Sequence, residues 1–523
     1  NLALIKKEQG LSEEAIELLL QLLKLNPEHN EAKLNAERTC NELGIRFNEE
    51  GKYGLALKYF QTLTDLLPTD ALGFYNMGNT YLELKDYKNA KELFKKALSI
   101  NPNYGSAHSN LGTVYRELGK IKKAISCFRR ALKIDPEDPN NYYNIGNILQ
   151  DAERIDGAEE NYKKAIALDP RHIGSHHNLA LLNEKKGHIN EGLNIAKKVL
   201  NFEISHPDIN HSIGIMSLQL GYFREGWRYY EYRWKVSPGN KVIWPFTDKP
   251  VWKGEEGRHI AVWKEQGIGD QVIFLSSMSE VRDMCASLSV YVDPRLQPLC
   301  RRAMPDINFV KDIDELKEAE SDYHLPIQSI GGIIRNDITD FNRTATGYLK
   351  ADPQRVEAIR HELKLNSKTV IGISWRSLSP TYKRKSIELR DMGGLFSGLD
   401  VVLVNLQYGD VDDEIKEFRE ETGIDVVQCT SVDNKEDLDG LAALIEVCDL
   451  VVSTSNVTVH MAGALAKETW VLLHYVSLYY WLLERTDSIW YPSLTLYRQP
   501  ALDDWDSVYK SIRKDLERKF QYN

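Results

Sequence analysis

The sequence predicts an α-helical solenoid followed by an α/β region that is built from two Rossmann-like halves. Two observations carry this prediction. The first is a 34-residue period in the N-terminal part of the chain, marked by Pro68, Pro102, Pro136 and Pro170. The second is a change of pattern after Trp234, where short runs rich in Val, Ile and Leu alternate with helical segments. Such runs are typical of strands in a parallel sheet that is buried on both faces.

The period is that of tetratricopeptide repeats, in which each repeat is a hairpin of two helices. Small residues recur where the two helices of a hairpin must cross closely, and bulky residues recur where consecutive hairpins must pack. The first small column is Gly44, Gly78, Gly112, Gly146, Ala180 and Gly214, the second is Ala56, Ala90, Ala124, Ala158, Gly192 and Gly226, and the bulky column is Phe60, Phe94, Phe128 and Tyr162. We therefore expect the solenoid over residues 1–234, with an insertion or irregular turn between Pro27 and Pro68, which are 41 residues apart.

Three further segments follow the solenoid. Residues 235–257 are rich in Pro, Gly and aromatic residues, and we interpret them as a junction. Residues 258–350 are expected to form the first half, and residues 351–523 the second half with a C-terminal helix. In such folds a ligand binds in the crevice at the carboxyl ends of the strands.

Composition limits the classes of function. Lys+Arg 66 and Asp+Glu 76 give a net charge of −10, which disfavours nucleic acid as a partner. The six cysteines form no C-x-x-C pair, so neither a disulfide framework nor a metal site is indicated, and a cytoplasmic protein fits best. No apolar run approaches the roughly 20 residues that span a bilayer, so we expect no transmembrane segment. The chain opens inside a helical pattern, so we expect residues before Asn1.

The first candidate loop follows the first strand of the α/β region. Gly267 and Gly269 would let a ligand approach the backbone at a helix start, with Gln271 beside it. Asp270 has two interpretations, which are an N-cap of that helix and a general base that faces the cleft. Glu265 begins the same loop and is the reserve candidate for the base.

The second candidate loop ends a later strand and opens another helix. It presents hydroxyl, amide and backbone N–H groups that could hold a pyrophosphate without a metal, although a plain capped turn would use the same residue types. His460 follows on the helix, where a packing role competes with ligand contact. The loop residues assigned to this phosphate site are Ser453, Thr454, Ser455, Asn456, Val457 and Thr458.

The third candidate loop is basic in an otherwise acidic protein. Its charges could neutralise phosphate, or they could form a solvated charge run. Gln407, after the next strand, is assigned to the same phosphate site. The residues of this loop are Trp375, Arg376, Ser377, Lys383, Arg384 and Lys385.

These segments, in this order after a repeat array, resemble bacterial proteins that fuse tetratricopeptide repeats to a GT-B glycosyltransferase with a heptosyltransferase-like catalytic region. The resemblance covers the whole chain. Its motifs are EQGIGD (265–270), GISW (372–375), LQ (406–407), DLVVS (449–453), HMAGAL (460–465), WYPS (490–493), RQ (498–499) and DW (504–505). It implies transfer of a sugar from a nucleotide-sugar to a protein Ser or Thr hydroxyl, with Asp270 as the base and with no metal or other cofactor.

One position departs from the family pattern, because Ser455-Asn456 stands where Asp-Thr is usual. An acidic contact to a sugar is therefore absent, and the alternative is a non-catalytic scaffold with a degenerate GT-B domain.

The architecture also looks like that of O-GlcNAc transferase, whose superhelix carries an asparagine ladder that grips a polypeptide backbone. The corresponding column is Asn76, Asn110, Asn144 and Asn178. Side-chain amides can both donate to and accept from a peptide backbone, although these residues could simply suit the first helix of each repeat. The resemblance suggests flagellin as one acceptor protein.

Overall fold

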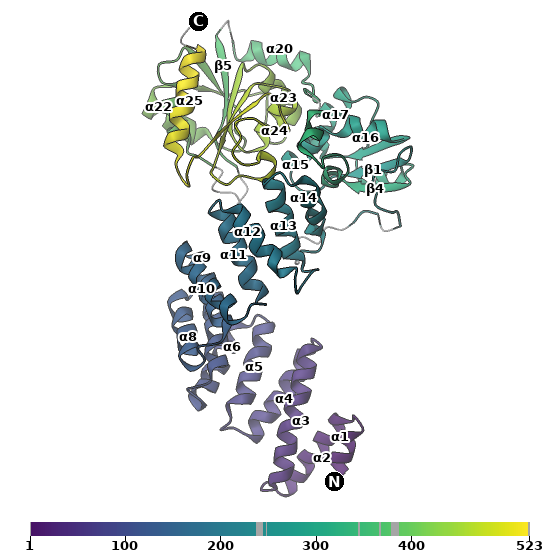
Figure 1. The fold of residues 1–523 in the computed structure, drawn as a ribbon, viewed down its shortest axis with the longest axis vertical. Coiled ribbons are helices and arrows are strands. Elements are labelled where there is room, and N and C mark those ends of the chain that lie inside the picture. The colour runs from purple at the N-terminus through teal and green to yellow at the C-terminus, as the bar shows by residue number, and fades with distance from the viewer. Residues whose placement is uncertain are drawn as a thin grey trace. The chain divides into compact units, whose positions relative to one another are not determined.

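The computed structural model describes residues 2–236, 244–246, 248–343, 346–365, 368–377 and 386–520 (Figure 1). The chain divides into two compact units, Asn1–Leu182 and Asn183–Asn523.

The first unit is a run of helical hairpins. Between hairpins, aspartates such as Asp70 and Asp138 cap the next helix by accepting a backbone N–H two residues on. The helices are α1 (Leu2–Glu8), α2 (Ser12–Leu25), α3 (Asn30–Glu49), α4 (Tyr53–Leu66), α5 (Ala71–Glu83), α6 (Tyr87–Ile100), α7 (Gly105–Glu117), α8 (Ile121–Ile134), α9 (Pro139–Asp151), α10 (Ile155–Leu168) and the start of α11 (Ile173–Lys185). The helical solenoid predicted for the N-terminal half is therefore confirmed.

The glycine column and the aromatic column of this unit meet as the pattern predicts. A Cβ atom at Gly112 would lie 2.9 Å from the ring of Phe128, and one at Gly78 would lie 2.7 Å from the ring of Phe94. Both rings are fully buried. Glycine is therefore the residue that lets the aromatic ring of the second helix pack against the first helix.

The irregular spacing near the N-terminus has a simple cause. Helix α3 has 20 residues, whereas the equivalent α5 has 13. The difference of 7 residues equals the difference between the 41-residue spacing and the 34-residue period. The insertion is thus two extra turns of helix, and the expected irregular turn is not needed.

The helical hairpins continue into the second unit. They comprise α12 (Ile189–Val199), α13 (Pro207–Gln219), α14 (Phe223–Tyr230) and the 3-10 helix η1 (Glu231–Trp234). The helical hairpins thus end at Trp234. The last of them share a compact unit with the α/β region. Trp227 of α14 explains this grouping, because its Nε1 donates to the Arg335 carbonyl at 2.7 Å and its ring meets Phe274.

The first sheet has four parallel strands in the order β3-β2-β1-β4. They are β1 (His259–Trp263), β2 (Ser287–Tyr291), β3 (Asn308–Phe309) and β4 (Tyr323–Pro326). Its α-helices are α15 (Ile268–Leu275), α16 (Met278–Met284), α17 (Gln297–Ala303), α18 (Ile313–Glu318) and α19 (Gly331–Ile334), and its 3-10 helices are η2 (Pro294–Leu296), η3 (Ile327–Ile330) and η4 (Ile338–Arg343).

The second sheet has six parallel strands in the order β10-β9-β8-β5-β6-β7. They are β5 (Thr369–Ser374), β6 (Val401–Asn405), β7 (Val426–Val427), β8 (Leu450–Thr454), β9 (Thr469–Leu473) and β10 (Leu494–Arg498). Its α-helices are α20 (Pro353–Glu362), α21 (Gly393–Phe396), α22 (Asp412–Thr422), α23 (Leu438–Glu446), α24 (Val457–Ala464) and α25 (Trp505–Phe520), and its 3-10 helices are η6 (Leu389–Met392) and η7 (Tyr479–Trp481). Parallel sheets with helices confirm an α/β region.

The described part of the junction packs against the first sheet. The Trp244 ring lies 5.1 Å from that of Trp234 and 5.6 Å from that of Trp263 on β1. Trp252 is buried, and its backbone N–H donates to the His324 carbonyl. The aromatic residues of this segment thus belong to the core of the second unit.

Candidate functional site

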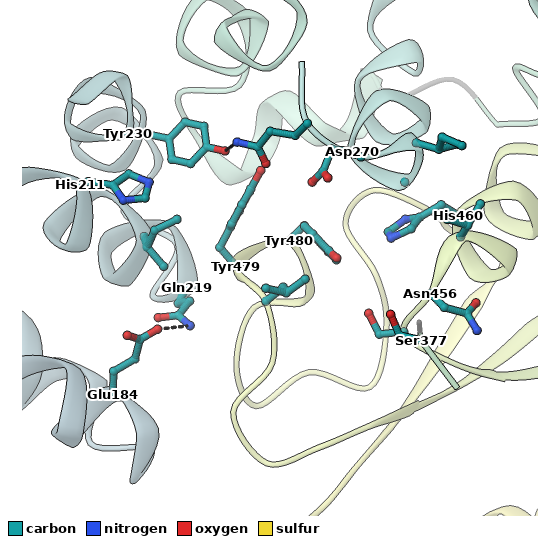
Figure 2. Close-up of a pocket in the computed structure, with 18 of the residues that line it drawn as sticks. Glu184, His211, Gln219, Tyr230, Asp270, Ser377, Asn456, His460, Tyr479 and Tyr480 are labelled. Atoms are coloured by element: carbon teal, nitrogen blue, oxygen red, sulfur yellow. Dashed lines mark hydrogen bonds between the residues drawn. The ribbon is translucent and has the colours of Figure 1, made fainter. Parts of the chain in front are cut away.

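A cavity of about 750 Å³ lies in the second unit (Figure 2). Its walls come from the turns that follow β1, β5, β6, β8 and β9, from the start of α24, and from the helices α11, α13 and α14. In both sheets the strand order reverses beside the first strand, between β1 and β4 and between β5 and β8. The carboxyl ends of strands at such a switch point are where open α/β sheets bind ligands.

Asp270 lines this cavity, and the structure corrects one interpretation of it. The N-cap of α15 is Gly267, so Asp270 is the third residue of the helix and not its cap. A carboxylate in the first turn still gains about 0.3–1 kcal/mol from the helix dipole. In Figure 2 its carboxylate points into the space between Tyr480 and His460.

Three tyrosines lie close enough to the Asp270 carboxylate for its charge to affect their pKa values. Burial raises the pKa of Tyr230, Tyr479 and Tyr491, and the negative charge of Asp270 raises all three further. These phenols therefore stay neutral at physiological pH. Neutral phenols can donate hydrogen bonds, but they are not bases at that pH.

Gly269 and His460 join the two halves at the cavity. A Cβ atom at Gly269 would lie 2.8 Å from His460 Cδ2, so glycine lets the imidazole approach the turn after β1. His460 stacks on Trp481 with ring centroids 5.5 Å apart, and its Nδ1 lies 3.1 Å from the Tyr491 hydroxyl. The packing role and the cavity-lining role proposed for this histidine thus coexist.

Residues 455–457 of the second candidate loop line the cavity. Asn456 caps α24, since its Oδ1 accepts from the Thr458 N–H at 3.0 Å, and its Nδ2 donates to Ser374 Oγ at 2.7 Å. Ser455 Oγ accepts from Trp481 Nε1 at 2.8 Å.

The other members of that loop lie beneath the cavity surface. Ser453, Thr454 and Thr458 are fully buried and outside the lining. Ser453 Oγ donates to the Thr454 carbonyl, and Thr458 Oγ1 donates to the Leu406 carbonyl. These residues hold the turn through internal hydrogen bonds, and donor contact by them stays a prediction.

The third candidate loop reaches the cavity only through Ser377 among its described residues. Arg376 pairs with Glu414, and its Nη2 donates to the Asp410 carbonyl at 2.9 Å. Trp375 is buried, and its Nε1 donates to Glu414 at 2.7 Å. The charge of Arg376 is thus neutralised within the protein.

The other three basic residues of this loop lie outside the described residues. They are Lys383, Arg384 and Lys385.

Gln407 holds the end of β5 in place. Its Oε1 accepts from Ser374 Oγ and from the backbone N–H groups of Trp375 and Arg376, at 2.9 to 3.0 Å. Gln407 lines a second cavity of about 700 Å³, formed with residues 428–436, and not the cavity that contains Asp270.

Glu265 and Gln271 also lie near the turn after β1, but both are outside the cavity lining and accept hydrogen bonds from other segments. Both oxygens of Glu265 accept from Arg233, at 2.9 and 3.0 Å, and Oε1 accepts from the Gln328 N–H. Gln271 Oε1 accepts from the Asp293 N–H at 2.8 Å. Glu265 is thus a buried partner of Arg233 outside the cavity lining, and the reserve assignment as a base is not favoured.

Several residues that line the cavity were not predicted from the sequence. They come from the last helical hairpins and from the segment after β9, and they include Glu184, His211, Gln219, Tyr230, Tyr479 and Tyr480. Repeat periodicity assigned the helical ones to solenoid packing. The only local signal was the pair of adjacent tyrosines in LYYW (478–481).

The asparagine column connects neighbouring hairpins of the first unit. Asn76 Nδ2 donates to Asn41 Oδ1, and Asn110 Nδ2 donates to Asn79 Oδ1, each at 2.7 Å. Asn178 makes the equivalent bond to Asn147, also at 2.7 Å. These bonds support the structural interpretation of the column, because each occupies one of the donors that a peptide ligand would need.

Among the described residues, no three His, Cys, Asp or Glu side chains are grouped so that they could hold a metal ion. Of the helices that the structure describes, none combines the length and apolar character needed to cross a membrane.

Family models for the tetratricopeptide repeat match residues 1–29, 70–137 and 139–172. The predicted repeats are therefore confirmed, and repeats of this kind indicate a role in protein interaction. The chain is similar to Protein FlbA of Caulobacter vibrioides, with 28% identity over 319 residues that cover 56% of this chain and 52% of FlbA. The chain thus spans about half the length of that relative.

Solved structures similar to this chain include three from bacteria. MamA of Desulfovibrio magneticus RS-1 is 26% identical, covers 32% of this chain and 96% of its own, and has a TM-score of 0.29. Pseudomonas aeruginosa PilF is 15% identical, with coverages of 40% and 95% and a TM-score of 0.36. Thermus thermophilus TTC0263 is 22% identical, with coverages of 38% and 99% and a TM-score of 0.31.

Proposed function

We propose that this chain is a GT-B glycosyltransferase that moves a sugar from a nucleotide-sugar to a Ser or Thr hydroxyl of a protein bound by the repeats. One observation carries the proposal. Asp270 at the start of α15, residues 455–457 at the start of α24 and His460 line a single cavity at the switch points of two parallel sheets. A carboxylate opposite a helix start is the arrangement that a base and a phosphate-binding group require.

On the donor side, the start of α24 offers backbone N–H groups and the positive end of a helix dipole to the phosphates. The Ser455 hydroxyl lies at the same turn. The proposal assigns phosphate recognition to this helix start, with no metal ion or other cofactor.

On the acceptor side, Asp270 takes the proton of the attacking hydroxyl. The hydroxyl oxygen forms a bond to the anomeric carbon, while the bond from that carbon to the phosphate oxygen breaks and its electron pair leaves with the nucleotide. Tyr230 already donates its hydroxyl hydrogen to Gln328, whereas Tyr479 lines the cavity and can donate to a substrate oxygen. Because these phenols are neutral, Asp270 is the base of the reaction.

All six cysteines are free thiols, which a reducing compartment favours. We therefore propose that the enzyme is cytoplasmic. Flagellin is one acceptor to test, because the family that the sequence resembles suggests it.

The first test is a thermal-shift panel of UDP-, GDP-, CMP- and ADP-sugars with the full chain. A donor present at 100 times its Kd should add about 2.7 kcal/mol to the free energy of unfolding. The donor that binds is then incubated with flagellin and with total cell protein, and the mass increase of one sugar is sought by mass spectrometry. Transfer should persist in EDTA. Failure of every donor to stabilise the protein would count against the proposal.

A second candidate function is a scaffold that binds proteins without catalysis. It is favoured by the engagement of Asn456 in capping and bridging and by the pairing of Arg376 with Glu414, which removes a charge from the donor side. A scaffold would bind protein partners through the repeats and would bind no nucleotide-sugar. The same panel therefore separates the two functions.

A further inference from the structure

The helical wall of the cavity carries polar groups that the proposed transfer reaction does not use. Glu184 at the end of α11 and Gln219 at the end of α13 line the same cavity as Asp270. Gln219 Nε2 donates to Glu184 Oε1 at 3.0 Å and to the Ser477 carbonyl at 3.3 Å. Figure 2 shows this pair on the opposite side of the cavity from Ser377 and Asn456.

Gln219 is only 4% exposed, and within the described residues its Oε1 has no hydrogen-bond partner. A buried acceptor without a donor is uncommon in folded proteins, and a ligand that offers a donor would satisfy it. The two bonds of Nε2 fix the amide so that Oε1 is the atom left over. The ligand that fits Oε1 must offer an N–H or O–H donor.

Two carboxylates in the described lining indicate the kind of donor. They are Glu184 and Asp270. Burial raises the pKa of Glu184, and a cation beside the carboxylate would lower it again. The remaining lining includes the rings of Tyr230, Tyr479 and Tyr480, whose faces also attract cations.

We propose that Glu184 and Gln219 form an acceptor subsite that binds a basic residue of the acceptor protein next to its Ser or Thr. An acidic residue at that position would meet two like charges and would be disfavoured. This inference rests on the proposed function, because it names the class of acceptor for the same cavity.

The test compares two peptides on the full chain at low ionic strength. Acetyl-AKSKA-amide and acetyl-AESEA-amide differ only in the residues beside the serine, and their Kd values are measured by ligand-observed NMR titration. The wild-type protein should bind the basic peptide at least about 10-fold more tightly. Glu184→Gln should reduce this preference to about 2-fold or less.

The control variant is Glu28→Gln, which alters net charge equally at an exposed position of the first unit. It should retain the full preference. Gln219→Met, which removes the buried amide, should weaken binding of the basic peptide by about 5-fold and keeps the inference testable if Glu184→Gln does not fold. Equal binding of the two peptides to the wild type, or an unchanged preference in Glu184→Gln, would overturn the subsite.

The nucleotide-sugar panel separates this inference from the function on which it rests. A preference that depends on Glu184 without any donor binding would support the subsite and overturn the transferase. Binding of a nucleotide-sugar donor without any preference between the peptides would support the transferase and overturn the subsite.

Discussion

The repeats before Leu182 and the hairpins after Asn183 share one sequence pattern but use it differently. In the first unit the aromatic column packs inside the solenoid, as Phe128 does against Gly112. Two repeats past Tyr162 the same column reaches Tyr230, which lines the cavity and donates from its hydroxyl to Gln328. The repeat pattern therefore specifies helical hairpins in both regions, while the surface that each aromatic residue meets decides its role.

The largest expected difference between the regions concerns Asp270. If it is the base, Asp270→Asn should lower turnover by roughly 10²–10⁴, with donor affinity nearly unchanged. The matched control is Asp138→Asn in the first unit, where the aspartate caps α9. Asn and Asp cap helices about equally well, so this control should alter neither turnover nor stability appreciably. Near-wild-type transfer by Asp270→Asn would make Asp270 a structural residue.

The next difference concerns two buried aromatic residues, each on the second helix of a hairpin, Phe128 on α8 and Trp227 on α14. Trp227→Ala and Phe128→Ala should each cost about 3–5 kcal/mol, the usual range for emptying an aromatic site. Hydrogen exchange should rise in different places, around α15 and the Arg335 carbonyl for Trp227 and in α7 to α9 for Phe128. Loss of protection in α7 to α9 caused by Trp227→Ala would contradict the division into two compact units.

A smaller difference separates two glycines of one column. A Cβ atom at Gly112 meets the Phe128 ring at 2.9 Å, whereas one at Gly214 meets the backbone nitrogen of Tyr230 at 2.5 Å. A ring can shift, but a helix backbone cannot do so without moving the cavity wall. Gly214→Ala should therefore cost about 1–3 kcal/mol, and Gly112→Ala should cost less, as measured by urea unfolding. Equal costs would contradict this reading of the two contacts.

The smallest expected effect lies within the asparagine column. Asn110 donates to Asn79, which lies 31 residues earlier, whereas the position 31 residues before Asn144 holds Thr113, whose hydroxyl donates to the Ser109 carbonyl. Asn110→Ala should thus cost about 0.5–1.5 kcal/mol, and Asn144→Ala should cost less. A ladder that grips peptide would instead make both variants lose acceptor-protein binding alike, which a pull-down would detect.

The candidate site could be predicted in part from the sequence. Asp270, residues 455–457 and His460 follow strands and begin helices, so their approach to one edge of the α/β region was a consequence of local pattern. Ionic and hydrogen-bond pairing was not predictable in this way. Glu265 is paired with Arg233, 32 residues away, and Arg376 with Glu414, 38 residues away.

By itself, the sequence determined the hairpins, the buried strands and the loops at the strand ends, because each depends on residues within one helix or one strand and turn. Tertiary structure decided which charges remain available and which helices form the cavity wall. Glu184 and Tyr230 occupy ordinary repeat positions, and they line the cavity because the last hairpins are part of the α/β core. Pairing and burial depend on groups distant in the chain, so no local pattern contains them.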